Sequence, residues 1–294
     1  MLTSKTMPKC DSIAAVVVLY NPSPDVIDNI LSWSTQVAKI FAIDNSEQSN
    51  ATVVKMLSGL DNLYYLWLGE NLGVATALNI GAERALSEGH HWLLTMDQDS
   101  EATPGMIDTM MGCLRGHNSG TVGIIAPFAS NKQHVAPPDQ VECSEEMTVI
   151  TSGNLLNLKA YLTVGHFWDQ LFIDQVDLEY CLRLNAAGFK VVRCNAAILN
   201  HNLGDMSTHR HHGKICHTTN HNPLRRYYIS RNRMYVIAKY RHLFPVYCAE
   251  MQKIYRGEIE SVLFFEKSKL HKLRMMLKGY LDYRRGITGK YRES

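Results

Sequence analysis

The chain has 294 residues, of which 46% are hydrophobic and 20% are charged. This composition is typical of a globular protein and excludes disordered, collagen-like and low-complexity classes. The length fits one large domain or two small ones. The longest apolar run, Ile13–Tyr20, is far shorter than the roughly 20 residues of a membrane helix. Residues 1–12 lack the apolar segment of a secretory signal.

The cysteines and the charge distribution indicate the cellular location and the kind of partner. The seven cysteines are scattered, and none forms a Cys-x-x-Cys pair. We therefore expect a reducing, cytoplasmic location, with neither a disulfide framework nor a thiolate zinc site. The net charge is +2, but residues 251–294 contain 11 Lys and Arg against 5 Asp and Glu. A basic end after a mildly acidic body indicates an anionic partner.

Short apolar strands alternate with helical patterns in the first half. The predicted strands are Ile13–Tyr20, Lys39–Asp44, Asn62–Leu68, His91–Asp97 and Thr121–Pro127. The predicted helices are Pro24–Gln36, Gly73–Ser87 and Thr103–Arg115. This alternation predicts an α/β fold with a mainly parallel central sheet flanked by helices. Ligands of such sheets bind at the carboxyl ends of the strands.

The second half is less regular. We expect a loop over 128–147, strands at Thr148–Thr151, Lys190–Arg193 and Ala196–His201, and a helix at Val176–Ala187. Residues 203–222 contain five histidines, and we interpret them as a mobile polar lid rather than a zinc site. From Pro223 the pattern is helical. The predicted domains are therefore a catalytic domain over 1–222 and a helical C-terminal region over 223–294.

Two carboxylates and a histidine follow predicted strands. Asp97 and Asp99 flank Gln98 directly after the apolar run Trp92–Met96. Carboxylates this close repel each other unless a cation neutralises them, and oxygen ligands suit Mg²⁺ or Mn²⁺. A solvated turn is the alternative. His201 also ends a strand, and it is equally compatible with a metal ligand and with an ordinary surface histidine.

Other polar residues occupy similar positions. Asp44 could accept hydrogen bonds from a ribose or base, or form an Asx turn. Asn71 precedes a helix N-terminus, where free N–H groups favour anions. Asp174, Asp177 and Glu179 stand around the start of a helix. The helix dipole favours acids there, and one of them could instead be a general base.

Two basic segments remain. Residues 225–241 contain six Lys and Arg and no acid, so we expect Arg225 and Arg231 to bind phosphate, with a solvated helix face as the alternative. Residues 251–294 mix bases with apolar residues at helical spacing. This segment could lie on an anionic membrane, or pack against the catalytic domain or another subunit.

Six segments occur in the order VVLYNP, IDNS, ENLGVATALNIG, MDQDS, SGNLL and DQVDLEYCLRLNAAGF. In this order, between Ile13 and Arg233, they resemble the inverting family 2 glycosyltransferases with the GT-A nucleotide-diphospho-sugar transferase fold. Within that family FIDQVDLEYCLR, NHNLGD and PLRRYYISRNRMY resemble bacterial rhamnosyltransferases of surface-polysaccharide assembly, such as that of the lipopolysaccharide O-antigen. This narrower resemblance implies a dTDP-L-rhamnose donor and a glycan hydroxyl acceptor, expected to be lipid-linked.

The resemblance also implies roles for the donor side. Tyr20 and Asp44 would contact the nucleotide base, and Asp97 would contact the ribose and approach the metal. Asp99 would bind Mn²⁺ or Mg²⁺, with His201 completing the protein ligands.

On the acceptor side, the resemblance implies that Ser152 and Gly153 line the sugar and acceptor. Asp177 falls at the position of the family's general base. Val176 precedes it where glutamate is common, so Asp174 is the substitute candidate.

Other functions stay open at this stage. The same fold could use UDP-galactofuranose, UDP-glucose or UDP-N-acetylglucosamine, or the chain could be a nucleotide-binding scaffold without turnover. A nucleic-acid binder is disfavoured by the acidic body. We expect a cytoplasmic protein, peripheral on the inner face of the plasma membrane, and the sequence leaves a homo-oligomer open.

Overall fold

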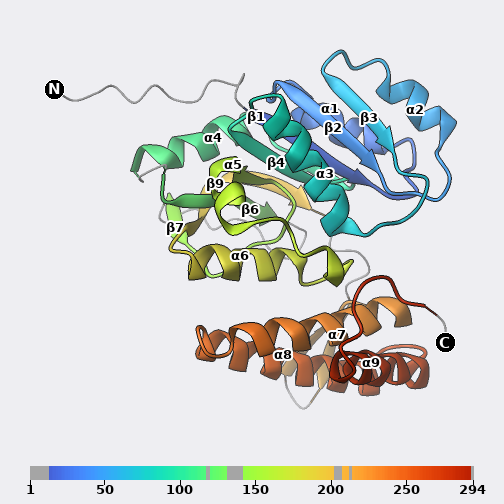
Figure 1. Cartoon of the computed structure of the whole chain (residues 1–294). Coiled ribbons are helices and arrows are strands. Elements are labelled where there is room, and N and C mark those ends of the chain that lie inside the picture. Colours follow the sequence, from blue (N-terminus) through green and yellow to red (C-terminus); the bar gives the residue numbers. More distant parts are fainter. Residues whose placement is uncertain (1–12, 117–119, 131–141, 202–206, 212–213, 293–294) are drawn as a thin grey trace. The chain divides into compact units, whose positions relative to one another are not determined.

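The structure is a computed structural model that describes residues 13–116, 120–130, 142–201, 207–211 and 214–292. The chain divides into two compact units (Figure 1). The first consists of residues 1–169 and 180–202, and the second of 170–179 and 203–294. The predicted division after residue 222 differs from this partition, which assigns 170–179 and 203–222 to the C-terminal unit.

A sheet of nine strands among the described residues forms the centre of the first unit. The strands are β1 (Ile13–Leu19), β2 (Lys39–Asp44), β3 (Leu63–Trp67), β4 (Trp92–Asp97), β5 (Ser100–Ala102), β6 (Val122–Ser130), β7 (Cys143–Glu145), β8 (Asn154–Asn157) and β9 (Lys190–His201). Their order is β3-β2-β1-β4-β8-β6-β9-β5, and β7 pairs with β9. The predicted parallel pairing holds for β3, β2, β1 and β4. Antiparallel β8 then enters between β4 and β6.

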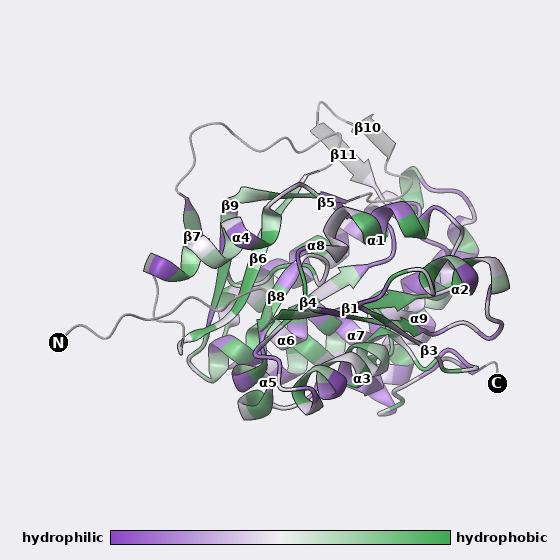
Figure 2. Cartoon of the chain, turned by 90° about the horizontal axis from the view of Figure 1, so that it is seen from above, coloured by the Kyte–Doolittle hydropathy of each residue, from purple (hydrophilic) through white to green (hydrophobic). Residues whose placement is uncertain are grey.

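Helices cover both faces of this sheet. They are α1 (Val26–Ser34), α2 (Ala51–Leu57), α3 (Val74–Ser87), α4 (Met106–Cys113), α5 (Leu158–Val164) and α6 (Val176–Ala186), the last running from one unit into the other. Ala15 and Val17 of β1 pack in the large core cluster with α1 and α4. Val16 faces α3, where a Cβ on Gly81 would lie 2.3 Å from its Cγ2 atom. Both faces of β1 are thus buried, which explains why all seven of its residues are apolar. Figure 2 colours the central strands mostly green, the hydrophobic end of its scale.

Several expected elements need correction. The strand predicted at Thr148–Thr151 does not form, and β8 lies at Asn154–Asn157 instead. The two strands predicted between 190 and 201 are one strand, β9, because a bulge opposite Pro127 and Phe128 absorbs the irregular residues. The 128–147 segment is not all loop, since β6 extends to Ser130 and β7 occupies Cys143–Glu145.

The sequence analysis also did not predict α2, α5 and β5, which are only three to seven residues long. Cysteine pairing is a further correction, because Cys113 and Cys143 form a disulfide where none was expected. Cys181, Cys194 and Cys248 are buried and form no disulfide within the described part of the chain. The described residues contain no helix that combines the length and the apolar character needed to cross a membrane.

The second unit is mostly helical. Its elements are the hairpin of β10 (Ser207–His211) and β11 (Lys214–Thr218), and the helices α7 (Pro223–Tyr240), α8 (Pro245–Phe264) and α9 (Lys269–Arg284). The hairpin falls where a mobile loop was predicted. Gly279 allows α9 to approach α7 closely, since a Cβ there would lie 2.4 Å from the carbonyl oxygen of Tyr227.

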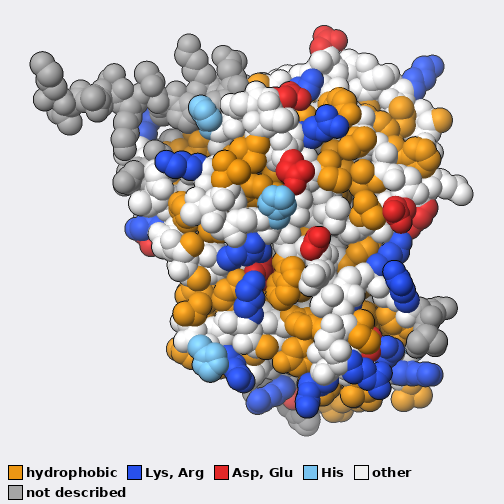
Figure 3. Space-filling view, viewed as in Figure 1, with side chains coloured by type: hydrophobic (Ala, Val, Ile, Leu, Met, Phe, Trp, Pro, Cys, Tyr) orange, Lys and Arg blue, Asp and Glu red, His pale blue; other side chains and the backbone are white. Residues whose placement is uncertain are grey.

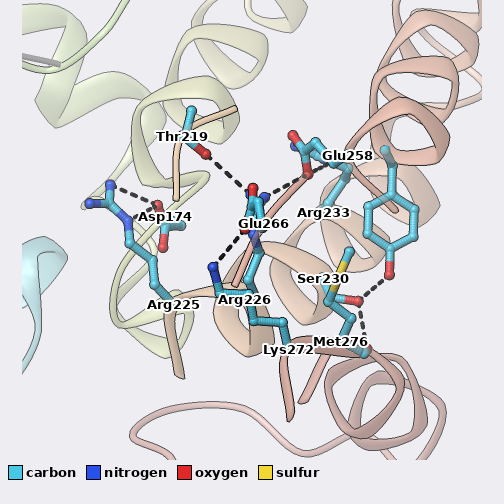
Figure 4. A network of polar contacts seen from close by, with 11 residues as sticks. Asp174, Thr219, Arg225, Arg226, Ser230, Arg233, Glu258, Glu266, Lys272 and Met276 are labelled. Atoms are coloured by element: carbon cyan, nitrogen blue, oxygen red, sulfur yellow. Dashed lines mark hydrogen bonds and ion pairs between the residues drawn. The ribbon is translucent and has the colours of Figure 1, made fainter. Parts of the chain in front are cut away.

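Buried ion pairs hold these helices together (Figure 4). Glu266 is 1% exposed and accepts hydrogen bonds from Arg226 and from Lys272 Nζ, the latter at 2.7 Å. Arg233 binds both carboxylate oxygens of Glu258, at 2.9 and 2.8 Å. Charges removed from water need such partners to offset their desolvation, so Arg226 and Arg233 of α7 take part in packing the helices.

Candidate functional site

The ends of β1 and β4 are joined by an amide that lies between two acids. The Gln98 side chain accepts a hydrogen bond from Tyr20 N at 2.8 Å and donates one to Tyr20 O at 3.1 Å. The backbone carbonyl of Gln98 accepts from Asn29 Nδ2 at 2.9 Å. These bonds fix the turn that carries Asp97 and Asp99. The sequence analysis named the two acids but missed the amide between them.

Asp97, Asp99 and His201 form one cluster, as predicted from their positions at strand ends. One ligand atom from each lies within 4.8 Å of the others. Asp99 is exposed, whereas Asp97 and His201 are half-buried. The donor set of two carboxylates and one imidazole with an open side fits a divalent cation such as Mn²⁺ or Mg²⁺.

A chain of buried hydroxyls supports this cluster from behind. Asp97 N donates to Ser152 Oγ at 3.1 Å, and Ser152 Oγ donates to Ser100 Oγ at 2.8 Å. Ser100 Oγ lies 2.8 Å from His201 Nδ1. Strand pairing explains the last contact, because Ser100 of β5 stands directly opposite His201 of β9. Both serines are fully buried, so the imidazole is held by the sheet itself.

The protonation state of His201 suits a ligand. Burial lowers the pKa of this imidazole, while the neighbouring Asp99 carboxylate acts in the opposite direction. A neutral imidazole can offer a lone pair to a cation. If Nδ1 carries the proton and donates it to Ser100, the Nε2 lone pair is left for the metal.

Asp44 and Asn71 are organised around the end of β2. The Asp44 carboxylate is buried and accepts from Ser46 N at 3.0 Å and from Tyr65 Oη at 2.6 Å. It thus forms the Asx turn that the sequence left as an alternative. Asn45 donates to Asn71 Oδ1 at 3.1 Å, which ties this turn to the loop before α3. Asn45 is a further polar residue of this edge that the sequence analysis did not single out.

Ser152 and Gly153 lie just before β8. Ser152 is committed to the hydroxyl chain described above. Gly153 has φ +84°, and a Cβ there would lie 2.6 Å from Pro127 Cγ. Its N–H donates to Thr95 O at 2.8 Å. A side chain at 153 would therefore collide with Pro127 of β6 and with Leu199 of β9.

The segment before α6, in the second unit, is strained. Phe172, Asp174 and Gln175 all have positive φ, at 68°, 61° and 66°. Non-glycine residues rarely adopt this conformation, and clusters of such residues are typical of functional sites. Asn232 of α7 stabilises the segment by donating to the carbonyls of Leu171 and Ile173, both at 2.7 Å.

Asp174 has a half-buried side chain whose two carboxylate oxygens differ in their contacts. Its Oδ1 accepts from Arg225 Nε at 3.2 Å, but its buried Oδ2 has no hydrogen-bond partner among the described atoms. Desolvation by burial raises its pKa to about 6, although the Arg225 guanidinium opposes the shift. Asp177 is half-buried in the first turn of α6. It adds a smaller upward contribution to the pKa of Asp174.

The other candidates in this unit have clear structural contacts. Glu179 is fully buried and accepts from Lys239 Nζ at 2.8 Å and Tyr240 Oη at 2.7 Å. Arg231 is 0% exposed, and its guanidinium donates to the carbonyl oxygens of Gly289 and Leu171 at 2.8 and 3.3 Å. It therefore stabilises this unit, whereas Arg225 keeps a partly exposed side chain.

His221 is the histidine of the predicted lid whose side chain lies within the described residues. Burial and the charges of Arg225, Arg226 and Lys272 lower its pKa to about 4. The other lid histidines, from His209 to His217, have side chains outside the described residues.

Two characterised transferases are similar to this chain in sequence. Over 298 aligned positions the chain is 28% identical to the dTDP-rhamnosyl transferase RfbF of Shigella flexneri, covering 95% of this chain and 97% of that protein. It is 23% identical to the low-salt glycan biosynthesis hexosyltransferase Agl10 of Haloferax volcanii, covering 65% of this chain and 67% of that protein.

Solved structures share the fold. S. aureus TarS 1-349 superposes with a TM-score of 0.57 at 12% identity, covering 92% of this chain and 80% of that one. GalNAc-T7 with UDP, GalNAc and Mn²⁺ superposes with a TM-score of 0.55 at 13% identity, covering 69% of this chain and 44% of that one. What this chain shares with both structures is the GT-A-like arrangement of sheet and helices. The family model of glycosyl transferase family 2 matches residues 15–172, more than half of the chain, and the chain belongs to that family.

Proposed function

We propose that this glycosyltransferase transfers L-rhamnose from dTDP-L-rhamnose to a sugar hydroxyl of a lipid-linked glycan, with inversion at the anomeric carbon. The observation that carries the proposal is the cluster of Asp97, Asp99 and His201 at the strand ends, supported from behind by two buried serines. The resemblance to RfbF over nearly the whole chain supports the choice of donor.

The roles follow from charge and position. Asp97, Asp99 and His201 would hold Mn²⁺ or Mg²⁺, which would neutralise charge developing on the departing nucleoside diphosphate. Tyr20, Asp44 and Asn71 lie around the ends of β1 and β2, where a nucleotide would bind. Ser152 and Gly153 are both buried, so they would support the sugar side from behind. Arg225 would add a phosphate contact.

Asp177 is the proposed general base. A hydroxyl is a poor nucleophile at neutral pH, so a carboxylate within hydrogen-bond reach accepts its proton as it attacks the anomeric carbon. Attack opposite the diphosphate forms the new glycosidic bond as the old bond breaks, which inverts the configuration in one step. Asp174 is the alternative base, and its raised pKa makes it a suitable proton acceptor near neutral pH.

Donor binding can be tested by calorimetry. We expect dTDP, with Mn²⁺ present, to bind the wild type more tightly than UDP does, and the metal-dependent part of the binding to disappear in Asp99→Asn. Glu101→Gln, which removes an exposed carboxylate two residues away, should bind as the wild type does. A preference for UDP would favour the UDP-sugar alternative. One of the solved structures with this fold, TarS 1-349, is a complex with UDP-GlcNAc.

Turnover tests the base. We expect Asp177→Asn to keep donor affinity and to lose transfer by a factor of about 10²–10⁴, the usual contribution of a general base. Asp169→Asn, which alters an exposed acid of the same region, is the matched control. If Asp174→Asn is inactive and Asp177→Asn active, Asp174 is the base. If donor binds but no variant or wild type transfers sugar, the scaffold alternative holds.

We further propose that the C-terminal helices lie on an anionic membrane surface. Leu270, Leu277 and Leu281 of α9 are 86%, 57% and 40% exposed. With exposed Arg274 and Arg284 they recur at helical spacing along one stripe of the helix. Figure 3 shows Lys and Arg side chains beside hydrophobic ones over these C-terminal helices.

Vesicle flotation tests this surface. Burying a leucine contributes about 1.5–3 kcal/mol, and each base near an anionic surface about 1 kcal/mol. The wild type should float with vesicles containing phosphatidylglycerol at low salt, and Leu270→Ser/Leu277→Ser should not. Equal flotation of both proteins would reject membrane binding. A concentration-dependent dimer in the wild type alone would instead assign the stripe to a second copy.

A further inference from the structure

Three cysteine sulfurs meet in the first unit, away from the acid and histidine cluster. Cys113 ends α4, Cys143 begins β7 and Cys194 lies within β9. Their sulfur atoms all lie within 4.8 Å of one another. Only two sulfurs are needed for the Cys113–Cys143 disulfide. The third, Cys194, is an additional free thiol at the bridge.

The fold explains why the three side chains converge. Cys143 and Cys194 are direct partners in the antiparallel pairing of β7 with β9, and such partners project to the same face of a sheet. The end of α4 packs on that face, and all three cysteines belong to the core cluster or pack against it. The convergence is thus set by strand register and helix packing.

The surroundings suit a soft ion. Cys113 and Cys194 are 4% and 0% exposed, while Cys143 is half-buried and gives access from solvent. The thiol of Cys194 lies 3.7 Å from the carbonyl oxygen of Thr109. Three cysteine sulfurs select thiophilic ions such as Zn²⁺ or Cu⁺ over the hard cations that carboxylates prefer.

We propose that the reduced forms of Cys113, Cys143 and Cys194 bind one thiophilic metal ion of the Zn²⁺ class. A thiol or phosphine reductant first opens the disulfide, which takes up two electrons and two protons and yields two thiols. One divalent ion then replaces three thiol protons and forms three metal–sulfur bonds, with a fourth position open to water. Disulfide and metal are therefore mutually exclusive states of the same three residues.

Co²⁺ is a suitable probe, because thiolate-bound Co²⁺ gives intense charge-transfer bands that oxygen and nitrogen ligands do not. The reduced full-length protein should develop these bands with one equivalent of Co²⁺, and Zn²⁺ should abolish them. The oxidised protein, with its disulfide intact, should give none. The Asp97, Asp99 and His201 cluster has no sulfur ligand and contributes no such signal, so the test is independent of the proposed glycosyl transfer.

Single-residue variants test whether the metal ion binds at these three cysteines. Cys194→Ala keeps both disulfide partners, so it should still form the bridge when oxidised, yet lose the charge-transfer bands when reduced. Cys248→Ala, which removes a buried free cysteine elsewhere, should behave as the wild type. Cys143→Ser provides a second variant if Cys194→Ala does not fold. Absence of the bands in the reduced wild type, or equal bands in folded Cys194→Ala, would overturn the proposal.

Discussion

Replacing Asp174 by Asn should change how the stability of the protein depends on pH. The side chain of Asp174 is 11% exposed. Its pKa is raised from 3.8 to about 6, chiefly by desolvation. Three charged groups act on it from the helices around it: Arg225 of α7 lowers its pKa, and Asp177 of α6 and Glu258 of α8 raise it. The net effect is that the folded state holds the proton more tightly than the unfolded chain does.

The sign and size of this pH effect follow from the difference in the pKa of Asp174 between the folded and unfolded states. A carboxyl whose folded pKa lies above its unfolded value stabilises the fold most when protonated, so this contribution is lost as the pH rises through about 6. A rise from 3.8 to about 6 corresponds to about 3 kcal/mol in all. Roughly 1.3 kcal/mol of it falls between pH 5 and pH 7. Asn does not titrate, so the variant lacks this pH-dependent term.

Urea denaturation at pH 5 and pH 7 measures the effect. The free energy of unfolding of the wild type, relative to Asp174→Asn, should fall by about 1 kcal/mol from pH 5 to pH 7. The loss of the Arg225 contact shifts the variant equally at both pH values, so the slope is the readout. Glu260→Gln, an exposed acid on α8, is the control and should keep the slope of the wild type. Parallel pH profiles of wild type and Asp174→Asn would refute the argument.

Two further predictions concern the described contacts. Glu266→Gln should lower the free energy of unfolding in urea by about 3–5 kcal/mol, because Arg226 and Lys272 would stay buried without their carboxylate. A loss below about 1 kcal/mol, as for an exposed ion pair, would contradict this reading. Ser100→Ala keeps all three proposed cation ligands but removes the partner of His201 Nδ1. It should weaken Mn²⁺ affinity by about 10–100-fold in calorimetry, and an unchanged affinity would mean that Ser100 does not orient the imidazole.

The pattern of apolar residues in the sequence predicted best those strands that are buried along their whole length. The bounds of β2 were predicted without error, and those of β1 and β4 to within one residue, since strands buried on both faces form continuous apolar runs. The short helix α2 escaped notice although Asn50 caps it by accepting from Thr52 N and Val53 N. A seven-residue helix with adjacent β-branched residues has too little periodicity to distinguish it from a loop.

Contacts between distant residues limited the prediction of the site. Six basic residues between 225 and 241 indicated phosphate binding or a solvated face. Arg231 does neither, because its acceptors, Leu171 and Gly289, lie about 60 positions away in the chain on either side. A local pattern cannot distinguish a buried cation that has distant carbonyl acceptors from an exposed one.

The cluster of Asp97, Asp99 and His201 shows why its members could be named from the sequence while its construction could not. The two acids follow an apolar strand, and that local signal is strong. The histidine is 102 residues beyond Asp99 and joins the cluster only because β5, three residues long, pairs antiparallel with the end of β9. That pairing sets Ser100 opposite His201, so the turn that presents the acids and the hydroxyl that contacts the imidazole belong to one continuous stretch of chain. A change in the register of β5 would therefore displace the Ser100 hydroxyl together with the two acids, so β5 and β9 jointly position the three side chains of the cluster.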